Sequence, residues 1–350
     1  MKVRGHETWV ARVPYEENRA ANHIVLRVRT DEGEHGVSYL TPLVPWTIKP
    51  ICAAIDALME KVVGQDVVAA ESINATLLTR AARPQFDGLA RSAASVIDLA
   101  LWDLKAKAFS QPLYRLLGAS GNSVPTYASW KLWPHYDLDS LARHAAEHVA
   151  SGFRGMKFHA GRARSADVIA RARLLREAVG NDIDLHLDMN FSRTVKEAIA
   201  IGEKLAPFNL SWIEGPIREH DHEGLRQISE VLETPICAGE TFHEARQFRS
   251  LLDHRGVDVV MVDLEVGGIT QWLKIAHIVE AYGLPVANHM CTEIAGHAIA
   301  AIGGLTVEYI PWAQALFKEV PAVENGKLIL SDRPGLGLEL DLAALKKFAS

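Results

Sequence analysis

Three acidic residues, Asp188, Glu214 and Glu240, recur at intervals of 26 residues. Each stands at the end of a short apolar segment, a pattern that indicates a buried strand. Consecutive strand–helix units would bring the three carboxylates to the same end of one sheet, where they repel one another unless a cation neutralises them. Oxygen ligands alone suit a hard divalent ion such as Mg²⁺. The alternative is that each acid pairs with a lysine or arginine, or caps the next helix.

Two basic residues, Lys157 and His159, lie on an earlier segment of the same kind. Because side chains alternate along a strand, both point inward while Phe158 points to the surrounding helices. A buried lysine is costly unless it is paired or its pKa is shifted, and beside a metal it can carry a proton or stabilise an oxyanion. For His159, a structural hydrogen bond and a contact with substrate both remain open.

A second histidine, His289, follows Asp263 by 26 residues, again at the ends of two consecutive apolar segments. Adjacent strands would place the two side by side. A carboxylate bonded to one ring nitrogen raises the basicity of the other, as a general base requires. A purely structural pair is the alternative. Glu308, on the last segment, either stays protonated and donates a hydrogen bond to a substrate carboxylate or is an outlying structural acid.

The elements that position these residues follow a regular rhythm from about residue 123. Short apolar segments alternate with stretches of helical periodicity, which predicts an α/β fold with a parallel sheet. Eight such strands close a (β/α)8 TIM barrel, whose active sites lie at the C-terminal ends of the strands. A doubly wound open sheet is the competing fold, but no glycine-rich phosphate turn follows the first strand. The predicted strands are 124–128, 155–159, 183–190, 210–214, 235–240, 257–264, 284–289 and 305–310.

The remaining residues predict a second, smaller unit. Residues 23–28 and 33–40 indicate a hairpin, and 91–108 has the apolar periodicity of a long helix. A chain of 350 residues also exceeds what one core usually supports. We predict an N-terminal α+β domain over 1–120, the barrel over 121–311, and a C-terminal segment over 312–350 that returns to the first domain.

Composition excludes several classes of protein. A hydrophobic content of 48% and a charged content of 23% are ordinary for a globular protein. The net charge of −6, without a basic block, gives no reason to expect nucleic acid or a membrane as partner. Three scattered cysteines predict neither a disulfide framework nor a zinc site. With no signal-like or membrane-spanning apolar stretch, we expect a cytoplasmic location.

Taken together, these motifs resemble the enolase superfamily, and within it the mandelate racemase-like subgroup. The likeness extends over nearly the whole chain. It rests on the helix 95–103, the segment 112–118, the three acids, Asp263 with Gly267 and Gly268, and His289 followed by Glu293 and His297.

This resemblance implies a capping domain that closes over a modified barrel of the (β/α)7β type. It also implies that Mg²⁺ binds the substrate carboxylate while a base takes the α-proton, so that the metal charge stabilises an enediolate. By the same resemblance His289 with Asp263 is one acid/base, Lys157 faces the other side of the substrate, and Asn190 lies beside the metal. Members are often oligomers, so we expect a homo-oligomer.

The sequence departs from the family pattern at His159. The second strand usually carries Lys-x-Lys, with the second lysine as a base, whereas here that place holds a histidine. This departure favours chemistry from His289. If a β-hydroxyl is present, its loss gives a 2-keto-3-deoxy acid, so we predict an acid-sugar dehydratase. Alternatives are a racemase or epimerase of a 2-hydroxy acid, a Schiff-base aldolase through Lys157, and a carboxylate-binding protein without activity.

Substrate choice in this family is set largely by loops of the capping domain. Here the corresponding region is 15–23. Its polar residues Asn18, Arg19, Asn22 and His23 are candidates to meet substrate hydroxyls. Of these we take His23 as a substrate-binding candidate, together with Asn190 beside the metal.

Overall fold

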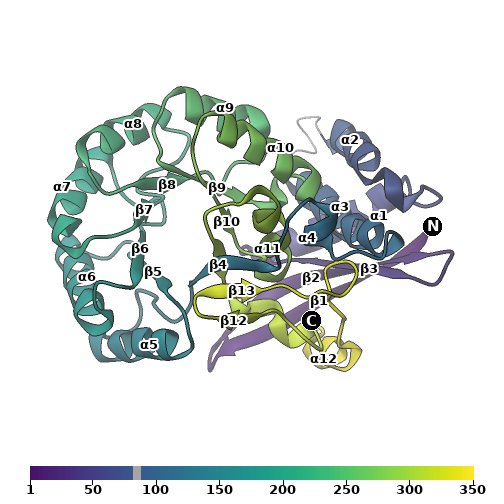
Figure 1. Cartoon of the computed structure of the whole chain (residues 1–350), viewed down its shortest axis with the longest axis horizontal. Helices are drawn as coiled ribbons and strands as arrows, with labels where there is room; N and C mark the ends of the chain where they lie inside the picture. Colours follow the sequence, from purple (N-terminus) through teal and green to yellow (C-terminus); the bar gives the residue numbers. More distant parts are fainter. Residues whose placement is uncertain (82–87) are drawn as a thin grey trace.

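The computed structural model describes residues 1–81 and 88–350, and its larger part is a barrel (Figure 1). Within these residues eight parallel strands alternate with seven helices, which confirms the predicted (β/α)7β barrel. The open sheet is excluded because the last strand pairs with the first. The barrel strands are β4 (Ser123–Ala128), β5 (Gly155–His159), β6 (Asp184–Asp188), β7 (Trp212–Glu214), β8 (Ile236–Ala238), β9 (Val259–Asp263), β10 (Val286–His289) and β11 (Val307–Tyr309).

Backbone and side-chain contacts both close the seam between β10 and β11. The backbone contacts include a bridge from Ala287 to Thr306. Asn288 accepts a hydrogen bond from the Glu308 backbone N–H at 3.0 Å, and the Thr292 hydroxyl donates to the Glu308 carbonyl at 2.8 Å. Since Asn288 precedes His289, these contacts tie two candidate site residues to one another.

The helices form a ring outside the strands (Figure 1). Their starts are specified locally: Asp137 accepts from the Ser140 N–H, and Thr194 with Glu197 makes a capping box. Their apolar faces pack on the strands, as Leu141 and Ala145 do. The helices are α5 (Leu138–Ala150), α6 (Ser165–Val179), α7 (Val195–Leu205), α8 (His222–Val231), α9 (Ala245–Asp253), α10 (Gly268–Ala281) and α11 (Thr292–Ile302).

An antiparallel sheet and three helices make up the N-terminal part. The predicted hairpin is present, and the first strand, which the sequence pattern did not predict, precedes it. That strand is half-buried along most of its length and lacks a continuous apolar run. The elements are β1 (Val3–Glu16), β2 (Arg19–Thr30), β3 (His35–Leu40), α1 (Ile48–Met59), α2 (Ala70–Ala81) and α3 (Leu89–Ala108).

Helix α3 locks this sheet to the barrel. The carboxylate of Asp98 accepts from the Thr270 backbone N–H at 3.0 Å and from its hydroxyl at 2.7 Å. The Trp102 indole donates to the same hydroxyl at 2.8 Å. A Cβ at Gly268 would lie 2.3 Å from Asp98 Oδ2, so only glycine permits this approach. The helix therefore sits directly on α10 of the barrel.

The C-terminal segment contacts both parts. Its hairpin pairs with β4 through Lys327–Ile329, and its last helix packs on β1, where Ala349 bridges to Ala11 (Figure 1). Among residues 1–81 and 88–350, no helix is long and apolar enough to cross a membrane. The remaining elements are α4 (Leu113–Leu116), β12 (Ala322–Glu324), β13 (Lys327–Ile329), α12 (Leu342–Phe348) and the 3-10 turns at Pro45–Thr47, Val67–Ala69, Ala206–Phe208, Leu264–Val266 and Pro311–Leu316.

Candidate active site

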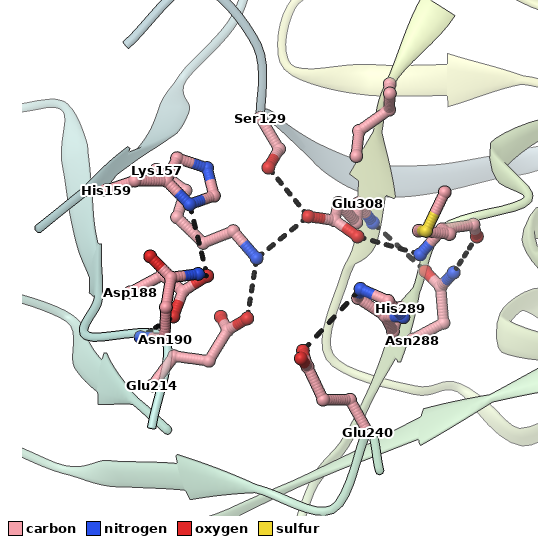
Figure 2. Close-up of polar contacts among 12 residues, drawn as sticks. Ser129, Lys157, His159, Asp188, Asn190, Glu214, Glu240, Asn288, His289 and Glu308 are labelled. Carbon is pink, nitrogen blue, oxygen red and sulfur yellow. Dashed lines mark hydrogen bonds and ion pairs between the residues drawn. The ribbon is translucent and has the colours of Figure 1, made fainter. Parts of the chain in front are cut away.

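The C-terminal ends of the barrel strands gather a group of charged and polar side chains (Figure 2). The strand register places His159 beside Asp188, and Asp188 beside Glu214. It also places His289 beside Asp263. Of the residues singled out from the sequence, the structure brings together Lys157, His159, Asp188, Asn190, Glu214, Glu240, Asp263, His289 and Glu308.

Lys157 bridges two carboxylates across this group. Its side chain is 1% exposed, and Nζ lies 2.6 Å from Glu214 Oε1 and 2.8 Å from Glu308 Oε1. Burial lowers the lysine pKa, but Glu214 and Glu308 outweigh burial and raise it well above its ordinary value. An ammonium held this way is a poor nucleophile, which argues against a Schiff-base aldolase.

Glu308 accepts hydrogen bonds from three donors. The Ser129 hydroxyl lies 2.6 Å away, the Met290 backbone N–H 2.7 Å and the Lys157 ammonium 2.8 Å. Burial raises the Glu308 pKa, but Lys157 and then His289 lower it to about 2. This arrangement favours the ionised form over the protonated donor that the sequence suggested. Ser129 was missed from the sequence, although its place directly after β4 is a usual signal of a site residue.

Asp188 is held by its neighbour two residues on. Asn190 donates from its backbone N–H at 2.6 Å and from its side-chain amide at 2.7 Å, one to each carboxylate oxygen. The chain can turn back in this way because Asn190 adopts a left-handed conformation with φ of 48°, which asparagine tolerates better than most residues. The amide of Asn190 therefore orients a candidate metal ligand.

His159 lies between this aspartate and a tryptophan. Its Nδ1 is 3.1 Å from Asp188 Oδ2, and its ring packs on Trp133 with centroids 4.1 Å apart. Burial lowers the His159 pKa, more than Asp188 raises it. The lowered pKa favours a neutral ring, and in the tautomer that donates to Asp188 the proton is on Nδ1. Nε2 is buried and makes no hydrogen bond to the described residues, so it is left as an acceptor.

Glu240 differs from the other two acids. Strand β8 ends at Ala238, earlier than predicted, and the chain turns at Gly239 with φ of 130°. Oε2 of Glu240 is buried and has no hydrogen-bond partner in the part of the chain that the structure describes; His289 Nε2 lies 3.6 Å away. Burial raises the Glu240 pKa well above its ordinary value, against the pull of His289. Glu240 therefore has His289 as a charge partner but makes no hydrogen bond to it through Oε2.

His289 is paired more closely. Its Nδ1 lies 2.6 Å from Asp263 Oδ2, and the other oxygen of Asp263 accepts from the Glu265 N–H at 2.6 Å. Burial lowers the His289 pKa, but Glu240 and Asp263 raise it well above the ordinary value. Asp263 thus fixes the ring and directs Nε2 toward the other acids.

The three acids have the donor chemistry of a hard cation site. Burial raises the pKa of Glu214 to about 7 against the pull of Lys157, and it raises the pKa of Glu240 well above its ordinary value against the pull of His289. As the side chains stand, no three Asp, Glu, His or Cys residues within the described ranges are close enough to hold a metal. Lys157 forms an ion pair with Glu214, and both His159 and Asn190 contact the carboxylate of Asp188. The residues nevertheless fit a divalent cation, because all of the oxygens come from carboxylates.

Within the described ranges, His23 makes no hydrogen bond or ion pair with the three acids. Its ring is fully buried, with Nδ1 3.0 Å from the Thr41 hydroxyl. A contact between His23 and substrate stays a prediction. The structure instead brings aromatic residues from the two parts of the chain together: Tyr15 of β1 stacks on Trp312 with centroids 5.0 Å apart, and Trp312 faces Trp133 at 6.0 Å. This row ends at His159.

Comparison with known proteins agrees with this geometry. Residues 6–118 match the mandelate racemase/muconate lactonizing enzyme N-terminal domain, and residues 140–344 match the enolase C-terminal domain-like family. The chain is 33% identical over 319 residues to the L-talarate/galactarate dehydratase of Salmonella typhimurium, which covers 91% of this chain and 80% of the relative.

Solved structures give the same result. The L-talarate dehydratase of Polaromonas sp. JS666, complexed with Mg and L-glucarate, superimposes with a TM-score of 0.92 at 29% identity, covering 100% of this chain and 97% of the other. A racemase of Streptomyces coelicolor with bound magnesium gives 0.93 at 28% identity, covering 99% and 100%. The chain belongs to the mandelate racemase/muconate lactonizing enzyme family of the enolase superfamily.

Proposed function

We propose that the protein is a Mg²⁺-dependent acid-sugar dehydratase. It removes the proton α to a carboxylate and eliminates the β-hydroxyl as water, which gives a 2-keto-3-deoxy acid. The observation that carries this proposal is the 2.6 Å pair of His289 and Asp263, with His289 also facing Glu240. The similarity to dehydratases of talarate and galactarate supports the same reaction class.

Asp188, Glu214 and Glu240 would hold the cation. A bound Mg²⁺ supplies positive charge for the substrate carboxylate and for the negative charge that develops there as the α-proton leaves. Asn190 keeps Asp188 oriented through both carboxylate oxygens. Glu214 is the acid that must exchange its contact with Lys157 for the cation, because Lys157 Nζ lies 2.6 Å from it.

His289 moves the protons. In its neutral form it takes the α-proton at Nε2 while Asp263 holds Nδ1–H, and the C–H electron pair passes into the substrate. The proton then goes from Nε2 to the β-hydroxyl, whose C–O bond breaks so that water leaves. The resulting enol gains a proton at the carbon that lost the hydroxyl and releases its own hydroxyl proton, which gives the 2-keto acid. One residue thus serves as base and then as acid.

Lys157 supplies fixed positive charge on the other side of the substrate. Glu308 holds its ammonium at 2.8 Å, and Ser129 and the Met290 N–H hold Glu308 in turn. An ammonium locked in this way stabilises negative charge without the cost of reorganising solvent. Lys157 therefore has an electrostatic role in this proposal.

A library of sugar acids tests the reaction. The protein is incubated with Mg²⁺ and each acid, and 2-keto-3-deoxy acid is read as its semicarbazone, with parallel samples in D₂O. We expect keto-acid product from one acid or a few related ones. Deuterium uptake without keto acid would contradict dehydration and favour the alternative below.

Replacing one proposed ligand tests the metal. Glu214→Gln should abolish turnover and Mg²⁺ binding by calorimetry, because an amide brings no charge to the cation. Glu223→Gln is the matched control, since the Glu223 side chain on α8 is 53% exposed and pairs with Arg226. Full activity in Glu214→Gln would remove Glu214 from the metal site.

A racemase or epimerase of a 2-hydroxy acid is the second candidate. It is favoured by Nε2 of His159, which has no hydrogen-bond partner among the described residues and offers a second acceptor on β5, apart from His289 on β10. The similarity to a racemase of Streptomyces coelicolor points the same way. Inversion of a 2-hydroxy acid without loss of water would establish it.

A further inference from the structure

Trp212 contacts a proposed metal ligand from inside the barrel. It begins β7 two residues before Glu214, so both side chains point inward. Its indole Nε1 donates to Glu214 Oε2 at 3.1 Å, while Lys157 takes Oε1 at 2.6 Å. Each oxygen of this carboxylate therefore has its own donor, one from the same strand and one from β5.

The indole ring cannot easily reorient. It stacks on His186 of β6, with centroids 3.6 Å apart and planes 16° from parallel. The edge of Tyr127 of β4 meets it at 5.3 Å. Trp212 is 2% exposed and belongs to the cluster that fills the barrel interior. Since the packing fixes the ring, it also fixes the direction in which the N–H donates.

We propose that Trp212 is a positioning residue for the metal site, an inference that rests on the proposed role of Glu214 as a ligand. When Glu214 releases Lys157 in favour of a divalent cation, the indole N–H is the contact that keeps the carboxylate oriented. Partners that hold a metal ligand in this way typically change metal affinity 10- to 100-fold when they are lost.

Metal binding is measured directly, without turnover. Mg²⁺ is titrated by calorimetry into the full-length protein, into Trp212→Phe and into Trp272→Phe. Trp272 is the matched control because it is also fully buried and donates Nε1 at 3.0 Å, but to the Val262 carbonyl. We expect Trp212→Phe to bind Mg²⁺ about 10- to 100-fold more weakly, and Trp272→Phe to bind within about twofold of the parent protein.

An isosteric side chain separates the N–H from the packing. Replacing Trp212 with 3-benzothienylalanine puts sulfur where the N–H was and keeps the ring shape that packs on His186. We expect the same loss of Mg²⁺ affinity with an unchanged melting temperature. Parent-like Mg²⁺ binding by this variant would overturn the inference, as would an equal loss in Trp272→Phe. If the unsubstituted protein does not bind Mg²⁺, the proposed metal site is wrong, and so is the positioning role of Trp212.

Discussion

Two histidines, His159 and His289, lie on opposite sides of the group of polar side chains at the strand ends (Figure 2). Each directs Nδ1 at an aspartate on a neighbouring strand. His289 lies 2.6 Å from Asp263, and His159 lies 3.1 Å from Asp188. The two pairs share residue types and placement. They differ in what surrounds them.

The surroundings shift the pKa values of the two histidine rings in opposite directions. Asp188 also accepts hydrogen bonds from the backbone N–H and the side-chain amide of Asn190, and it is a proposed metal ligand. The ring of Trp133 packs on His159. Burial accordingly lowers the His159 pKa. Asp263 accepts a hydrogen bond from Nδ1 of His289, and Nε2 of the same ring faces Glu240. Together these carboxylates outweigh burial and raise the His289 pKa. A histidine–aspartate pair therefore does not define an acid/base by itself; the next neighbour decides.

Replacing His289 should have the largest effect. In His289→Asn the amide can still reach Asp263, but nothing remains to accept the α-proton. We expect kcat for dehydration to fall about 10³-fold, within the usual range for loss of a general acid–base group. Calorimetric Mg²⁺ binding should be retained, since His289 is not among the proposed ligands. Dehydration near the native rate would place the base elsewhere.

A third buried histidine, for which the described residues supply no carboxylate partner, shows how burial shifts a histidine pKa. His297 accepts a hydrogen bond from the Tyr114 backbone N–H at its Nδ1, 3.1 Å away, and burial lowers its pKa to about 4. Between pH 6.5 and 4 the unfolded chain therefore binds a proton that the folded chain refuses. Stability falls as pH falls through this window, by about 3 kcal/mol for this group.

Urea unfolding at pH 7 and pH 4.5 measures this contribution. The variant His297→Asn keeps an acceptor for the Tyr114 N–H but does not titrate, so its stability should fall less between the two pH values. The difference between parent and variant isolates His297 from other groups. Equal losses in both proteins would show that its pKa is not lowered, and would weaken the contrast with His289.

Much of the barrel was predictable from two patterns in the sequence. One is the alternation of side chains along each strand, and the other is the regular spacing of successive strand–helix units. The alternation rule placed Lys157 and His159 inward, and the 26-residue interval placed Asp263 beside His289. The end of β8 was set too late, since an apolar run does not reveal the turn at Gly239.

Side-chain partnerships across the barrel were not predictable in the same way. A lysine side chain is a flexible chain of four carbons. The position of Lys157 on β5 therefore does not predict that its ammonium bridges Glu214 and Glu308. Two further donors to Glu308 are Ser129 and Met290, which lie 179 and 18 residues away in the sequence. Such contacts depend on three-dimensional packing that local patterns do not carry.

The smallest effect is expected at His159. In His159→Asn the amide replaces the Nδ1–H donor to Asp188 but removes the Nε2 acceptor. If dehydration runs from the His289 side, kcat should fall less than about tenfold, the level of a single modest hydrogen bond.

His144→Asn is the control for that variant. This ring is also buried and bonded, at 2.8 Å to the Lys131 carbonyl, but it has no aspartate partner in the described structure and should leave kcat unchanged. Proton exchange in D₂O, followed on each stereoisomer of the substrate, gives the more telling result. Loss of exchange from one isomer alone in His159→Asn would make His159 a second base. The two histidine–aspartate pairs would then be functionally equivalent in spite of their different neighbours. That result would favour the racemase hypothesis over dehydration.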